Sequence, residues 1–122
     1  MTINILLIDD DPIIHGGVKS NNECLHERYG SVIYSATGEN SALRQLKKHE
    51  MDLVFCDTSF DGIDMGPEIA NRIREIYPEI RIIGVSTNSN TRRLWEPEYE
   101  FRDKDCLTLK NLEKLLKEII GR

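Results

Sequence analysis

The sequence predicts an α/β fold: a doubly wound parallel sheet with helices on both faces. Short apolar runs alternate with segments of helical periodicity along the 122 residues, in the order β-α-β-α-β-α-β-(α)-β-α that is typical of such sheets. The runs at 3–8 and 53–56 are apolar at nearly every position, as expected of strands that are buried on both faces. The length suits one domain, and we expect residues 1–122 to form it.

In the first half of the chain, turn-forming and helix-capping residues separate the expected elements. Pro12 suits the first turn of a helix that Gly30 ends, although Gly16-Gly17 and Asn21-Asn22 lower its helix propensity. The β-branched and aromatic residues after Gly30 favour a strand. The expected elements are strand 3–8, helix 12–29, strand 31–36, helix 39–49 and strand 53–56.

The second half begins with a loop rich in glycine and aspartate. Pro67 fits the first turn of a helix whose buried face includes Ile76, and the last helix carries Leu109 on its apolar face. Residues 88–97 leave room for only one short or irregular helix, and we expect Trp95 within this segment to fill the core. The expected elements are loop 58–66, a helix from 67 that Pro78 stops, strand 80–85, the irregular segment 88–97, strand 99–102 and helix 109–119.

The composition argues against several functional classes. A net charge of −5 without a block of Lys or Arg argues against nucleic-acid binding through a basic surface. The apolar runs are too short to cross a membrane, and no basic segment precedes an apolar one at the start, so we expect a cytoplasmic protein. No metal or redox role is expected for the cysteines or histidines, and the histidines are expected to be exposed: Cys24, Cys56, Cys106, His15, His26 and His49.

Polar residues of catalytic type follow the expected strands. Asp9 and Asp10 come after the first strand and Asp57 after the third, so all three are expected at the carboxyl edge of the sheet. Clustered like charge is costly unless a cation fills it, and Mg²⁺ prefers such oxygen ligands. Ser86 follows the fourth strand and Lys104 the fifth. A cation, a lysine and a hydroxyl around a carboxylate suit phosphoryl transfer to that carboxylate.

Four motifs resemble the receiver domain of two-component response regulators, and the resemblance covers nearly the whole chain. It implies a flavodoxin-like sheet with strand order 2-1-3-4-5. It also implies that Asp57 accepts a phosphoryl group from a histidine kinase or a phosphotransfer protein. The motifs are Ile5-Leu6-Leu7-Ile8-Asp9-Asp10-Asp11-Pro12, Leu53-Val54-Phe55-Cys56-Asp57, Ile82-Ile83-Gly84-Val85-Ser86 and Phe101-Arg102-Asp103-Lys104.

The resemblance assigns a role to each site residue. Asp10 and Asp57 would bind Mg²⁺ directly, Asp9 would act through water, and the backbone carbonyl of Ser59 would complete the ligand set. Lys104 would pair with the phosphoryl group. The switch residues would be Ser86, with Thr87 as the weaker alternative, and Phe101.

The chain departs from the family pattern at three places. Asp105 stands where a proline usually follows the lysine, Phe60-Asp61 replaces the usual Met-Pro, and the fourth helix is short or irregular. These departures leave the cognate kinase, the downstream protein target and homodimer formation open.

Three hypotheses follow. The first is a stand-alone receiver without an output domain, which undergoes only self-phosphorylation from a donor and slow autodephosphorylation. The second is a degenerate receiver that acts as an interaction module independently of phosphorylation. The third is a phosphatase with Asp57 as nucleophile, but Ser59 stands where that chemistry needs a second aspartate.

Overall fold

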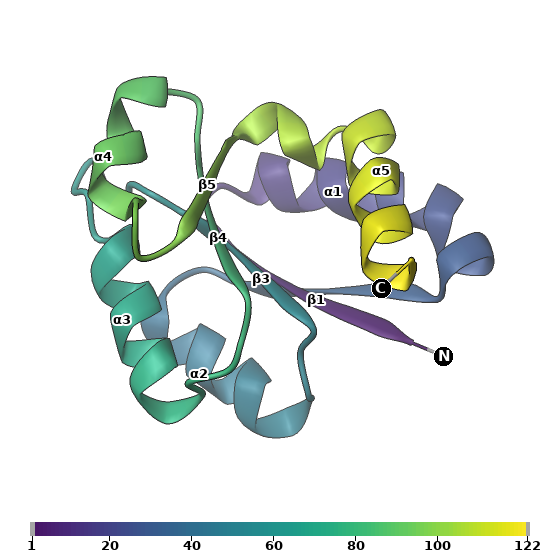
Figure 1. Cartoon of the computed structure of the whole chain (residues 1–122), viewed down its shortest axis with the longest axis horizontal. Helices are drawn as coiled ribbons and strands as arrows, with labels where there is room; N and C mark the ends of the chain where they lie inside the picture. The colour runs from purple at the N-terminus through teal and green to yellow at the C-terminus, as the bar shows by residue number, and fades with distance from the viewer. Residues whose placement is uncertain (1, 122) are drawn as a thin grey trace.

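Five parallel strands form one sheet between two layers of helices in the computed structural model, which describes residues 2–121 (Figure 1). The strands lie in the order β2-β1-β3-β4-β5, so the predicted flavodoxin-like topology is confirmed. The strands are β1 (Ile3–Ile8), β2 (Ser31–Ala36), β3 (Leu53–Asp57), β4 (Ile82–Ser86) and β5 (Glu100–Asp103). The helices are α1 (Pro12–Tyr29), α2 (Glu39–Lys48), α3 (Gly66–Ile76), α4 (Arg92–Trp95) and α5 (Leu109–Ile120), with 3₁₀ turns η1 (Ser89–Thr91) and η2 (Lys104–Leu107).

The sheet separates two hydrophobic clusters. On one face, β-strand side chains pack with residues from α2, α3 and α4, such as Ala42, Ile73 and Trp95. On the other face they pack with residues from α1 and α5, such as Val18 and Leu115. Figure 1 shows α1 and α5 together on one side of the sheet and α2 and α3 on the other. Every residue of β3 and β4 is buried, as the continuous apolar runs predict.

Two strands begin later than the sequence predicts. The N–H of Ile80 donates to the carbonyl of Tyr77 at 3.2 Å, so a turn precedes β4, which starts at Ile82. The N–H of Tyr99 donates to the carbonyl of Trp95 at 3.0 Å, and β5 therefore starts one residue later, at Glu100. In both places a backbone N–H that could have joined the sheet is already paired locally.

The segment between β4 and β5 contains only a 3₁₀ turn and the four residues of α4. The predicted short fourth helix is therefore confirmed. Trp95, its last residue, has no exposed surface, which confirms the expectation that it fills the core. A cis peptide bond joins Glu96 to Pro97 immediately after it.

Two apolar residues were wrongly predicted to be buried, and both lie at helix ends. Ile76, the last residue of α3, is 58% exposed, and Leu109, the first of α5, is 42% exposed. Helical periodicity assigns a residue to a face, but a helix end extends past the sheet that would cover it. Within residues 2–121, no helix combines the length and apolar character needed to cross a membrane.

Candidate functional site

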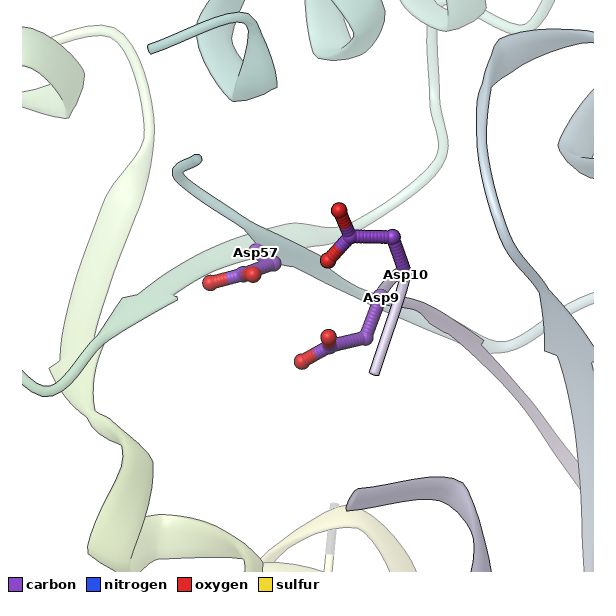
Figure 2. Close-up of side chains that lie close together, drawn as sticks. All are labelled: Asp9, Asp10 and Asp57. Atoms are coloured by element: carbon purple, nitrogen blue, oxygen red, sulfur yellow. The ribbon is translucent and has the colours of Figure 1, made fainter. Parts of the chain in front are cut away.

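Three carboxylates meet at the carboxyl edge of the sheet. Asp9 and Asp10 follow β1, Asp57 ends β3, and these strands are paired in register with Ile8 opposite Cys56. One ligand oxygen from each of Asp9, Asp10 and Asp57, hereafter the acidic cluster, lies within 4.8 Å of the others. Figure 2 shows Asp9 and Asp57 extending side by side from the two strand ends, with Asp10 next to them. The sequence predicts that these three carboxylates lie close together, and the structure confirms it.

Asp57 is a buried carboxylate with the negative charge of Asp9 and the positive charge of Lys104 beside it. The residue is only 7% exposed, and this burial, with the nearby charge of Asp9, raises the pKa of its carboxyl above the ordinary value. The positive charge of Lys104 and the backbone N–H of Thr58 act in the opposite direction. Asp57 therefore has an environment that penalises its charge, as is common for groups in functional sites.

Lys104 connects the acidic cluster to β5. Its Nζ lies 3.0 Å from Oδ2 of Asp9 and 3.2 Å from Oδ1 of Asp57. Burial lowers the pKa of Lys104, but its hydrogen bonds and the charges of Asp9 and Asp57 outweigh this effect, so the pKa lies above its ordinary value. Lys104 is therefore a fixed positive charge beside the buried carboxylate.

The donor set fits a hard divalent cation. Asp9, Asp10 and Asp57 converge through carboxylate oxygens, and the Lys104 ammonium is the positive charge beside them. This is the ligand chemistry that Mg²⁺ prefers. The three aspartates would hold the ion, and its charge would offset the mutual repulsion that the cluster otherwise carries.

The loop after β3 folds back over the acidic cluster. Phe60 and Ile63 form an isolated antiparallel bridge, and Asp61 between them has a positive φ of 51°. The backbone N–H of Asp61 donates to Oδ2 of Asp10 at 3.0 Å. The hydroxyl of Ser59 donates to Asp64, and the predicted role of the Ser59 carbonyl as a metal ligand stays a prediction.

The two expected switch residues lie on β4 and β5. Ser86 is the last residue of β4 and is 8% exposed, and its Oγ accepts a hydrogen bond from the N–H of Asn88 at 3.0 Å. Phe101 pairs with Gly84 across the strands and is buried, with the guanidinium of Arg92 5.0 Å above its ring. Thr87 is exposed.

His15 is not exposed as predicted, because the first turn of α1 lies against the end of β1. Only 9% of the residue is accessible, and its Nε2–H donates to the carbonyl of Asp9 at 2.6 Å. Asp11 caps the same helix, since its side chain accepts the N–H of Ile13. An aspartate immediately before a proline is a recognisable cap signal, but nothing local in the sequence indicates the contact of His15.

Thr58 was also missed as a site residue. It follows Asp57 directly, is 1% exposed, and its backbone N–H donates to Oδ1 of Asp57 at 2.9 Å. A threonine after a strand usually indicates only a turn or a strand end, so no local pattern points to this role.

Comparison with known proteins agrees with the fold and identifies the family. The family model described as "Response regulator receiver domain" matches residues 5–118. This chain belongs to the response regulator receiver family. None of the curated proteins searched matches it.

Solved structures share the fold at low sequence identity. A putative response regulator from Chloroflexus aurantiacus is 20% identical with a TM-score of 0.78, each chain being covered completely. The chemotaxis protein CheY4 of Vibrio cholerae is 18% identical with a TM-score of 0.79, over 98% of this chain and 99% of the other. A two-component response regulator from Clostridium difficile is 22% identical with a TM-score of 0.79, over 99% and 98% of the two chains.

Proposed function

We propose that this domain accepts a phosphoryl group on Asp57 from a histidine kinase or a phosphotransfer protein. The observation that carries the proposal is the position of Lys104, whose Nζ lies within 3.2 Å of both Asp9 and the buried Asp57. A carboxylate nucleophile with a fixed cation beside it suits phosphoryl transfer, in which catalysis is mostly positioning and charge stabilisation.

The transfer exchanges one bond to phosphorus for another. An oxygen of the Asp57 carboxylate forms a P–O bond as the P–N bond of the donor's phosphohistidine breaks, and the donor imidazole keeps the electron pair. Lys104 offsets the charge on the transferred group. Hydrolysis later breaks the new P–O bond and returns the Asp57 carboxylate and inorganic phosphate.

Mg²⁺ is the cofactor that we propose. Asp10 and Asp57 would bind it directly, Asp9 through water, and the Ser59 carbonyl would add an oxygen ligand. The charge of the acidic cluster and its oxygen donors support this assignment. When bound, the ion stabilises charge on the phosphoryl oxygens.

The phosphorylated domain would signal by a change in its docking to another protein. Ser86 on β4 and Phe101 on β5 are the proposed switch residues. Since α4 has only four residues, the surface around it differs from that of a receiver with a full fourth helix. A cytoplasmic location and homodimer formation stay predictions.

The test is the intact mass of the protein after incubation with acetyl phosphate and Mg²⁺. We expect one phosphoryl adduct on the wild type and none on Asp57→Asn. Asp61→Asn is the matched control, because Asp61 is an exposed aspartate of the adjacent loop and asparagine tolerates its positive φ. It is expected to be phosphorylated like the wild type.

Three results would contradict the proposal. An adduct on Asp57→Asn equal to that on the wild type would mean that another residue is the acceptor. No adduct on the wild type, together with no Mg²⁺ binding, would favour a phosphorylation-independent interaction module. Repeated turnover of a simple phosphomonoester that Asp57→Ala abolishes would instead indicate a phosphatase.

A further inference from the structure

Thr58, the residue after the proposed acceptor, forms four hydrogen bonds to three other residues. Its backbone N–H donates to Oδ1 of Asp57 at 2.9 Å and to the carbonyl of Val85 at 3.1 Å. Its hydroxyl donates to the same Val85 carbonyl at 2.9 Å. The hydroxyl oxygen also accepts the indole N–H of Trp95 at 2.9 Å. The hydroxyl thus links the acceptor loop both to β4 and to α4.

Trp95 has little freedom to leave this position. Its side chain is completely buried, and its ring lies against the α-carbons of two glycines. A Cβ added at Gly84 would come within 2.2 Å of the indole, and one at Gly66 within 2.8 Å. The edge of the ring also meets Tyr99, with centroids 5.7 Å apart. Since protein interiors are close-packed, the indole N–H is fixed in direction as well as in place.

We propose that Trp95 is a positioning residue for phosphoryl transfer at Asp57, acting through the hydroxyl and the backbone N–H of Thr58. The inference rests on the proposed function of Asp57. The inference goes beyond that function in one respect: Trp95 of the short helix α4 orients the backbone N–H of Thr58 beside Asp57. Trp95 and Thr58 lie 37 positions apart in the chain.

The physical reason is preorganisation. The N–H of Thr58 donates to Oδ1 of the carboxylate that must become the nucleophile, and so holds that carboxylate in one orientation. A nucleophile that is already oriented reaches the transition state without having to reorganise. If the Thr58 hydroxyl loses either of its partners, the loop can rotate and the N–H no longer holds its direction.

The experiment measures the rate of Asp57 phosphorylation at saturating acetyl phosphate and Mg²⁺. Thr58→Val removes the hydroxyl at nearly constant shape, and Trp95→Phe removes the indole N–H. Each is expected to slow the reaction by about three- to tenfold, the size of one lost buried hydrogen bond. Thr58→Ser keeps the hydroxyl and is expected to restore a rate near that of the wild type.

Tyr99→Phe is the matched control. It removes the hydrogen bond from the Tyr99 hydroxyl to Asn71 at 2.6 Å, in the same hydrophobic cluster, and it keeps the ring that packs against Trp95. Its phosphorylation rate is expected to equal that of the wild type. The free energy of unfolding, measured on every variant, separates a general loss of stability from a specific loss of rate.

The double variant tests whether Thr58 and Trp95 act as one unit. If they do, the double variant is slowed about as much as either single variant, whereas independent effects multiply. Wild-type rates in both single variants, or an equal slowing in Tyr99→Phe, would overturn the inference while the proposed function stands. A wild type that accepts no phosphoryl group would overturn both.

Discussion

At the scale of single residues, Asp57 is stabilised less well than an exposed aspartate. Burial and the charge of Asp9 both disfavour its ionised form, and Lys104 only partly compensates. The protein therefore keeps a carboxylate where it costs stability, as functional residues often do. The loss of unfolding free energy caused by this carboxylate depends on pH and can be measured.

Asp57→Asn is expected to be more stable than the wild type at pH 7 without Mg²⁺. The folded-state pKa of Asp57 lies above its ordinary value of 3.8. The stability contributed by this carboxyl is therefore complete below that value and is lost as the pH rises through the folded-state pKa. The advantage of Asp57→Asn should vanish near pH 3.5 and grow toward neutrality.

Urea unfolding of both proteins between about pH 3.5 and 8, with a chelator present, measures this difference. A difference that does not change with pH would show that the charge of Asp57 is not its source. A wild type that is the more stable protein at pH 7 would show that the ion pair with Lys104 outweighs the burial of the carboxylate.

At the scale of elements, residues that weaken a helix in isolation can stabilise it in the fold. Asn21 and Asn22 lower the helix propensity of α1, yet their side-chain amides donate to the carbonyls of Leu107 and Ser31, each at 3.1 Å. These bonds attach α1 to η2 and β2. Glycine likewise has two different roles. A Cβ added at Gly16 would meet no atom within 4 Å, whereas one added at Gly84 would overlap the Trp95 ring.

Gly84→Ala is expected to reduce the free energy of unfolding by at least about 2 kcal/mol, because the new methyl group would overlap the buried indole. Gly16→Ala is the matched control. It lies in α1 with open space around a new Cβ, and it is expected to add about 1 kcal/mol through helix propensity. Thermal unfolding of both variants measures the contrast, and equal effects would contradict the tight packing of Trp95 on β4.

At the scale of the whole molecule, the site exists only because the sheet brings distant strand ends together. β1 and β3 are neighbours, and β4 separates β3 from β5, so the long side chain of Lys104 spans that distance. The unfolded chain has no such cluster. A ligand that needs all these groups binds only the folded state and therefore stabilises it.

Mg²⁺ is accordingly expected to raise the free energy of unfolding, by about 2.7 kcal/mol at a concentration 100 times its dissociation constant. Asp10→Asn removes one proposed ligand at an exposed position and is expected to weaken this stabilisation, with an affinity about tenfold lower. Asp61→Asn, outside the acidic cluster, should respond like the wild type. Thermal unfolding at constant ionic strength measures these effects, and an equal response in Asp10→Asn would place the ion elsewhere.

Local patterns predicted most of the fold and part of the site. The apolar runs located β1 and β3 because a strand buried on both faces leaves an unmistakable pattern, and the acids at their ends were correctly grouped. The exposure of apolar residues at helix ends, the start of β4 and the burial of His15 were predicted poorly. Each of these depends on where a neighbouring segment lies, and local periodicity does not contain that information.

The sequence by itself determined the strands and the acids that gather at their ends, because these follow from burial patterns along one strand at a time. The acceptor role proposed for Asp57 comes from the resemblance of its motifs to the receiver family. Only the tertiary structure decided that Lys104 contacts both Asp9 and Asp57, and that Trp95 bonds to Thr58. These contacts join segments far apart in the chain. Their geometry is set by the packing of side chains between the sheet and α4, which the order of residues does not reveal.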